Sequence, residues 1–195
     1  SGTTGRSKGA MLTHGNLHSN AVALPDCWGW RKDDVLLHAL PIFHVHGLFI
    51  ASHCALLNGT PMIFLPKFEV NQVFEWLPDC TVLMGVPTFY TRLLSLPSLT
   101  PDYVNHMRLF ISGAATLTEV TFREWKEKTG VEILERYGMS ETNINTSNPI
   151  DGDRVAGTVG FPLQGLNLRI SDSEGKELPR GEIGTIEVSG PAVMK

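Results

Sequence analysis

The 195-residue sequence contains only three cysteines, Cys27, Cys54 and Cys80, which lie far apart. Their odd number excludes a complete disulfide framework, and they lack the paired spacing of a zinc site. We therefore expect free thiols in the core and a reducing compartment, the cytoplasm. We assign these cysteines no role as catalytic nucleophiles.

Positive charge and long apolar runs are also scarce. The formal net charge is −4, with 16 Lys and Arg against 20 Asp and Glu and no basic block, so nothing indicates a nucleic-acid or anionic membrane partner. The longest apolar stretch, LFIASHCALL, is interrupted by Ser52 and His53 and is too short to span a bilayer. No signal peptide precedes Ser1. The sequence predicts a soluble protein that binds small molecules and leaves its oligomeric state open.

Short apolar segments alternate with longer amphipathic ones, a pattern typical of β/α units. Strands are predicted at 35–40, 61–65, 81–86, 108–112 and near 131–138. Helices are predicted at 16–24, 47–57, 70–77, 88–96 and 118–128. Because parallel strands need such crossovers, we expect an α/β fold with a mostly parallel sheet flanked by helices.

The pattern changes near residue 157, where β-rich runs alternate with turn-forming segments. LNLRISD and GTIEVSG predict an antiparallel, β-rich segment. We therefore predict a division into an α/β subdomain, 1–156, and the start of a β-rich subdomain, 157–195. Both ends are abrupt, which indicates a fragment of a longer chain.

The opening stretch SGTTGRSKG combines glycines, hydroxyls and two cations. Its glycines let the backbone approach a ligand closely, while Lys8 and Arg6 bring positive charge. The composition indicates a polyphosphate clamp, although a flexible linker uses similar residues. The spacing is neither that of a Walker loop nor GxGxxG.

Three further polar segments are placed at strand ends. LPIFHVHGLF carries His44 and His46, which could line a pocket or be structural. RLFISGAATLT places Gly113 after a strand, where small residues leave room for a flat ring, although a plain turn explains them nearly as well. ERYGMSETN gathers groups typical of a site, but Glu135 and Arg136 could equally form a local ion pair.

These motifs, in this order, resemble the signature segments of the adenylate-forming enzymes, the superfamily of acyl-CoA synthetases. The resemblance implies that this chain is part of the large N-terminal domain, with the small C-terminal domain absent. It implies that the opening loop binds the β- and γ-phosphates of ATP through Ser1, Gly2, Thr3, Thr4, Gly5 and Lys8. It implies that Gly113, Ala114 and Ala115 border the adenine and that Tyr137 stacks on it beside Gly138. Ser140, in place of the usual threonine, would bond the α-phosphate, and Glu141 would ligate Mg²⁺. Thr116 departs from the proline of many relatives.

The segment GVPTFYTRLL bears on the acid that is activated. Helical spacing places Thr88, Arg92 and Ser95 on a face away from the apolar stripe, which by itself favours a solvated arginine. The chain is, however, most similar to malonyl-CoA synthetases, which implies that Arg92 holds the distal carboxylate of the substrate. A guanidinium suits that role because it pairs bidentately with carboxylate.

The same resemblance implies a substrate site and a reaction. The substrate-binding residues would be His44, His46, Arg92, Gly113 and Met139, and the catalytic residues Lys8, His44 and Glu141. Malonate or methylmalonate would form an acyl-adenylate with ATP and Mg²⁺, and coenzyme A would then displace AMP. We expect little activity from the isolated chain. The alternatives are another short-chain or aromatic acid as substrate, or a non-catalytic nucleotide-binding module. A phosphotransferase is disfavoured by the spacing around Lys8.

Overall fold

A seven-stranded sheet forms the centre of the computed structural model, which describes residues 9–195. The strand order is β2-β1-β3-β4-β5-β6-β7. Strands β1 to β5 run parallel, whereas β6 and β7 are antiparallel to their neighbours. The strands of this sheet are β1 Leu36–His38, β2 Met62–Phe64, β3 Val82–Gly85, β4 Leu109–Ser112, β5 Ile133–Met139, β6 Asn143–Ser147 and β7 Phe161–Pro162. The predicted fold class is confirmed.

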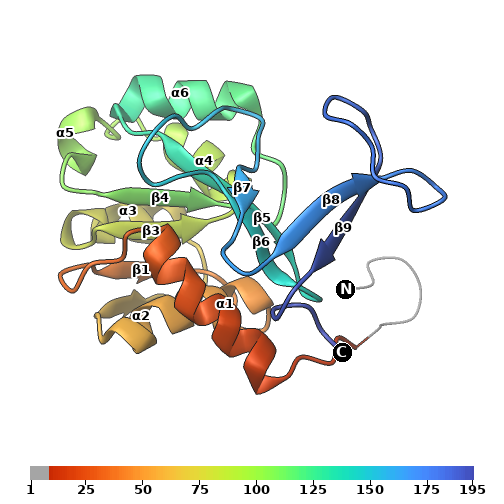
Figure 1. Ribbon diagram of the computed structural model, residues 1–195. Coiled ribbons are helices and arrows are strands. Elements are labelled where there is room, and N and C mark those ends of the chain that lie inside the picture. Colours follow the sequence, from red (N-terminus) through yellow and green to blue (C-terminus); the bar gives the residue numbers. More distant parts are fainter. Residues whose placement is uncertain (1–8) are drawn as a thin grey trace.

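Helices cover both faces of the sheet (Figure 1). α1 and α2 pack together on one face, and α3 to α6 form a contiguous layer on the other. The helices are α1 His14–Cys27, α2 Ser52–Asn58, α3 Val70–Trp76, α4 Pro87–Leu94, α5 Pro101–Val104 and α6 Glu119–Thr129, with a π-helix η1 at His46–Ala51 and a 3₁₀ turn η2 at Leu77–Asp79. The predicted helix 47–57 is thus a π-helix continued by α2.

Local sequence explains where the main helices begin and end. In α1 the Thr13 hydroxyl accepts a hydrogen bond from the Asn16 N–H at 3.1 Å, and the Asn16 side chain accepts one from the Thr13 N–H at 2.8 Å. This reciprocal cap satisfies two N–H groups that have no partner within the helix. α6 starts after the Thr118 cap and ends at Gly130, whose φ of 76° favours glycine.

The central strands are buried on both sides, which explains their continuous apolar runs. Every residue of β3 and β4 is buried. Phe110 of β4, Tyr90 of α4 and Trp125 of α6 meet edge to face, with ring centroids 4.9 to 6.5 Å apart. The five predicted strands of the parallel sheet are confirmed, whereas β6 and β7 were not predicted.

β8 (Asn167–Ser171) and β9 (Thr185–Ser189) form a separate antiparallel sheet beside the carboxyl ends of the parallel strands (Figure 1). The expected antiparallel character of this segment is confirmed. β7 still pairs with β6, so the large sheet continues beyond residue 156. The division of the chain at that residue stays a prediction.

Two other expectations concern membranes and thiols. In the described part of the chain, no helix combines the length and the apolar character needed to cross a bilayer. All three cysteines are free; Cys54 and Cys80 are buried and Cys27 is half-buried. Burial raises the pKa of Cys80 to about 12, so this thiol is protonated and unreactive at neutral pH.

A buried ion pair joins the start of β4 to the loop before β1. The Arg108 Nε donates to Asp34 Oδ1 at 3.0 Å, and a second bond links Nη2 to Oδ2. Arg108 Nη1 also donates to the carbonyl of Trp28 at 3.2 Å. Burial raises the pKa of Asp34, but the bonds from Arg108, the Arg31 amide and Thr81 outweigh it and hold the pKa below 3.8.

We predict that Asp34→Asn lowers the free energy of unfolding by about 3 kcal/mol, because it leaves the Arg108 charge uncompensated in a buried position. Urea denaturation of the chain measures the change. As control, Glu119→Gln breaks an exposed pair with Arg123 and costs less than about 0.5 kcal/mol. Equal losses in the two variants would contradict this account of the buried pair.

Candidate active site

Three neighbouring cavities lie at the carboxyl ends of the parallel strands and share one residue, Ala114. The β5 cavity, of about 370 Å³, is lined by Ala114, Ala115, Thr116, Glu135, Arg136, Tyr137, Gly138, Gly157 and Val159. The central cleft, of about 20 Å³, is lined by His44, Val45, His46, Ile50, Ala114, Arg136, Gly138, Met139, Ser140, Asn143 and Ile144. The apolar cavity, of about 250 Å³, is lined by Leu40, Pro41, His44, His46, Val86, Phe89 and Ala114. In α/β sheets, ligands bind at this end of the strands.

Ala114 follows β4 directly and adopts a left-handed backbone conformation, with φ of 67°. This region is unfavourable for a residue with a Cβ atom, and such strain concentrates at functional sites. The small side chain leaves the space around it open to all three cavities. A ligand that extends from one of these cavities into another would therefore lie beside the backbone of Ala114.

His44 lies in the segment between β1 and the π-helix η1, and His46 is the first residue of η1. The His46 N–H, at the start of η1, donates to His44 Nδ1 at 3.1 Å. In neutral His44 this bond assigns the proton to Nε2, which is then free to donate. π-Helical turns are frequent at functional sites. Both histidines line the central cleft and the apolar cavity.

The side chain of His46 is buried, and neither ring nitrogen has a partner among the described residues. Burial holds its pKa well below 6.5, and the positive charges of Arg136, His44 and His38 lower it further. His46 is therefore neutral at physiological pH. A neutral imidazole keeps one donor and one acceptor for a bound molecule.

The end of β5 and the turn that follows it carry further predicted site residues. The strand register shifts between Tyr137 and Gly138, and a Cβ atom at Gly138 would overlap the Asn143 carbonyl, so glycine is required there. Tyr137 lines the β5 cavity, and Ser140 lines the central cleft. The Glu141 side chain is half-buried and pairs with no cation within residues 9–195.

Arg136 and Glu135 do not pair with each other. The Glu135 carboxylate instead accepts the Leu117 N–H at 2.9 Å. The Arg136 side chain is buried, with Nε and Nη2 unpartnered among the described residues. It lies against Gly113, where any Cβ atom would overlap the guanidinium. The local ion pair considered from the sequence is therefore not found.

Arg92 is exposed on α4, as its helical position predicted. Its guanidinium carbon lies 6.0 Å from the centre of the Phe68 ring, and Phe68 stacks on Phe89 at 3.9 Å. Phe89 lines the apolar cavity, whereas Arg92 lines none of the three cavities. The predicted contact of Arg92 with a carboxylate stays a prediction.

The structure thus brings together most of the described residues that the sequence singled out. Those that line the three cavities are His44, His46, Ala114, Ala115, Tyr137, Gly138, Met139 and Ser140. Gly113 lies against the Arg136 side chain. Glu141 lies in the turn between β5 and β6. Ser1, Gly2, Thr3, Thr4, Gly5 and Lys8 are outside the described residues.

Sequence reasoning missed Arg136 as a lining residue, as well as Val86 and Phe89. Arg136 lines the β5 cavity together with its neighbours Glu135 and Tyr137, so no alternation along β5 distinguishes it in the sequence. Within residues 9–195, no cluster of three or more His, Cys, Asp or Glu side chains is arranged to hold a metal ion.

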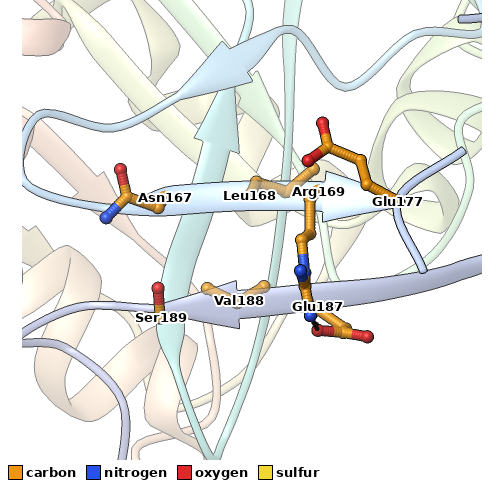
Figure 2. A pocket seen from close by; sticks show the side chains of 7 residues that line it. All are labelled: Asn167, Leu168, Arg169, Glu177, Glu187, Val188 and Ser189. Carbon is orange, nitrogen blue, oxygen red and sulfur yellow. Dashed lines mark hydrogen bonds and ion pairs between the residues drawn. The ribbon is translucent and has the colours of Figure 1, made fainter. Parts of the chain in front are cut away.

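The largest cavity, about 480 Å³, lies on the β8–β9 sheet instead. Figure 2 shows Arg169 reaching from β8 across to Glu187 on β9, with Glu177 near the end of β8. Arg169 donates two hydrogen bonds to Glu187, at 2.9 and 2.7 Å. Arg169 and Glu187 form an exposed pair, and the remaining carboxylate, Glu177, is exposed to solvent, so this cavity has no buried charge that requires a ligand.

A mostly parallel sheet with polar loops at its carboxyl edge defines an α/β domain, an architecture whose ligand sites lie at that edge. The sequence matches the family described as AMP-binding enzyme over residues 1–195, and the chain belongs to that family. The fold and motif resemblance inferred from the sequence is confirmed.

Similar proteins and solved structures within this family include malonate–CoA ligases. A mitochondrial malonate–CoA ligase of Mus musculus is 41% identical over an alignment of 186 positions that covers 87% of this chain and 32% of that protein. ATP-bound MatB from Rhodopseudomonas palustris is 61% identical with a TM-score of 0.98, covering 100% of this chain and 39% of that one. A malonyl-CoA ligase with methylmalonyl-CoA and AMP bound is 38% identical with a TM-score of 0.90, covering 100% and 43%. The chain thus spans about a third of the mouse relative.

The lowered pKa of His46 leads to a prediction of pH dependence. The unfolded chain takes up a proton at this residue below pH 6.5, whereas the folded chain does not. His46 therefore supports folding fully above pH 6.5, and this support is lost as the pH falls below it. We expect the free energy of unfolding to fall less steeply with decreasing pH in His46→Leu than in the unaltered chain. Parallel pH profiles from urea denaturation would refute this.

Proposed function

We propose that this chain forms the nucleotide- and acid-binding part of an ATP-dependent acid–CoA ligase that activates malonate or methylmalonate. The observation that carries the proposal is the meeting of three cavities at Ala114. It gives one ligand-sized cavity beside Tyr137, one apolar cavity, and a polar cleft between them. The likeness to ATP-bound MatB supports ATP as substrate, and the malonate–CoA ligases among the relatives support the acid.

The β5 cavity suits the adenine. Ala114 and Ala115 offer a flat, small-residue wall, and Tyr137 lines the same cavity; an aromatic ring stacks on a base. Ser140 in the adjoining cleft has a hydroxyl for the α-phosphate. We propose that Ser1, Gly2, Thr3, Thr4, Gly5 and Lys8 bind the β- and γ-phosphates.

The acid occupies the cleft and the apolar cavity beside His44 and His46, with Gly113 and Met139 as further neighbours. One carboxylate oxygen attacks the α-phosphorus, and pyrophosphate leaves with the electron pair of the broken P–O bond. The Nε2 proton of His44 and the charge of Lys8 are the groups that we propose to stabilise the added negative charge. The thiolate of coenzyme A then attacks the acyl carbon and displaces AMP.

The chemistry of Glu141 suits the role of a magnesium ligand. Its carboxylate is hard, partly accessible and not committed to a cation in the described part of the chain. Mg²⁺ in nucleotide sites is held by one or two carboxylates together with the phosphates, so the lack of a larger acidic cluster is compatible. When bound, the ion neutralises phosphate charge and orients the pyrophosphate leaving group.

The proposal extends to the organisation of the protein. Residues 1–156 would bind ATP and acid, 157–195 would begin a β-rich subdomain, and a further domain would complete the coenzyme A site, leaving this chain alone weakly active. The three free thiols support a reducing compartment such as the cytoplasm. A second candidate, a ligase for another short or aromatic monocarboxylic acid, is favoured by the apolar lining around Phe89.

The test is a pyrophosphate-release assay of the full-length protein that carries this sequence, with malonate, methylmalonate, acetate, butyrate and benzoate. We expect kcat/KM to be highest for the two dicarboxylates and product formation to require coenzyme A. Higher values for butyrate or benzoate would favour the second candidate. ATP binding without any acid-dependent turnover would instead indicate a non-catalytic nucleotide module.

We also predict that Glu141→Gln lowers kcat at least about tenfold and raises the Mg²⁺ concentration for half-maximal rate, since a neutral amide is a weaker ligand for a hard cation. Glu119→Gln, on exposed α6, is the matched control and should match the unaltered enzyme. An unchanged Mg²⁺ dependence in Glu141→Gln would remove this residue from the metal site.

A further inference from the structure

The segment 190–195, which follows β9, lies beside the residues that lead into α1 (Figure 1). The Lys195 N–H donates to the carbonyl of Met11 at 3.2 Å. Ala192, within the segment, is buried. The segment is therefore packed against the domain, and its contacts join parts of the chain that are far apart in the sequence.

Asn16, in the first turn of α1, binds this segment through its side-chain amide. Its Nδ2 donates to the carbonyls of Pro191 and Val193, at 2.7 and 2.8 Å. The residue is buried, with 8% of its surface exposed. Both hydrogens of the amide are used in these bonds. An ionised aspartate has the same shape but no donor, so it could make neither bond.

The oxygen of the same amide has a separate role in the cap of α1. Asn16 Oδ1 accepts from the N–H and from the hydroxyl of Thr13, both at 2.8 Å. This cap needs only an acceptor at position 16, and a carboxylate is favoured at a helix N-terminus. The two donors are thus more than the helix requires. Their use indicates that asparagine is needed at this position for the contact with segment 190–195.

Segment 190–195 in turn contacts the turn that carries Glu141. The Met194 N–H donates to the carbonyl of Glu141 at 2.8 Å. From the other side, Asn143 Nδ2 donates to the carbonyl of Ala192 at 3.3 Å. The turn between β5 and β6 is therefore held by two hydrogen bonds to a segment that Asn16 itself holds.

The conformation of this turn depends on such outside contacts. Asn143 has a left-handed backbone, with φ of 56°, and residues other than glycine keep this conformation where the surrounding structure fixes it. Met139, Ser140 and Asn143 line the central cleft. A shift of the turn would therefore change the cleft and move Glu141 with it.

Asn16 itself lines none of the three cavities. We propose that Asn16 is a positioning residue: by holding segment 190–195 it fixes the turn that presents Ser140 and Glu141 to the α-phosphate and to Mg²⁺. The inference rests on the proposed function. It adds a residue that acts on the site through the backbone carbonyl of Glu141.

The first test variant is Asn16→Asp in the full-length protein, because it keeps the acceptor for the cap and removes both donors to segment 190–195. In the pyrophosphate-release assay with malonate, we expect kcat to fall about tenfold, since a small displacement of a reacting group is costly. The Mg²⁺ concentration for half-maximal rate should rise several-fold. An unchanged Mg²⁺ dependence would overturn the proposal.

Thr13→Val is the matched control. It removes the hydroxyl of the cap and leaves the bonds from Asn16 to segment 190–195 in place. It should lower the melting temperature because a helix cap is lost, and it should keep the Mg²⁺ dependence of the unaltered protein. Equal shifts of the Mg²⁺ dependence in Thr13→Val and Asn16→Asp would overturn the proposal, because the effect would then come from the start of the helix.

Two further variants test the route through Glu141. Met194→Pro removes the N–H that binds the Glu141 carbonyl and leaves α1 unaltered, so it should shift the Mg²⁺ dependence in the same direction even if Asn16→Asp fails to fold. In the double variant Asn16→Asp/Glu141→Gln, the Mg²⁺ shift should equal that of Glu141→Gln alone. Shifts that multiply, or an unchanged dependence in Met194→Pro, would overturn the proposal.

Hydrogen exchange of the full-length protein without ligands gives a readout that needs no activity. Asn16→Asp should speed exchange at least about tenfold at the amides of Thr142 and Met194, because the contacts that protect the turn are weakened. Thr13→Val should leave both amides unchanged. Unaltered exchange of both amides in Asn16→Asp would overturn the positioning role. A lack of acid-dependent turnover in the unaltered protein would instead contradict the proposed function, and exchange alone would then decide whether Asn16 holds the turn.

Discussion

The contact between the Arg136 guanidinium and the backbone of Gly113 sets the geometry at the carboxyl edge of the sheet. It requires glycine after β4 and brings the end of β5 against the loop that starts at Ala114. Ala114 follows in a left-handed conformation and lines the β5 cavity, the central cleft and the apolar cavity. The arrangement thus depends on a charged side chain packed where an apolar one would be expected.

The same contact explains why this edge differs electrostatically from the rest of the molecule. The Asp34–Arg108 pair is buried but satisfied, and the Arg169–Glu187 pair on the β8–β9 sheet is satisfied and exposed (Figure 2). At the cavities, the buried Arg136 cation instead lies near a neutral histidine and polar atoms that have no partner within residues 9–195. A fold that tolerates this arrangement without ligand gains most when an anion binds, which suits an enzyme that handles carboxylates and phosphates.

Much of the fold could be predicted from the sequence because its strands are short, apolar and separated by amphipathic helices, as the five parallel strands and α6 illustrate. β6 was missed because its sequence, NINTS, is polar although all five residues are buried. The histidines and the Tyr137–Ser140 segment were predicted from residue type and motif order. Arg136 was not, because its importance lies in what it lacks, a carboxylate partner, and only the packing of β5 against Gly113 reveals that.

The most direct measurement is a crystal structure of the full-length protein with malonate and a non-hydrolysable ATP analogue. The account predicts the adenine against Tyr137 in the β5 cavity and a malonate carboxylate beside His44, facing the α-phosphate. A nucleotide bound away from the β5 cavity, or a malonate whose reacting carboxylate does not lie beside His44, would contradict it.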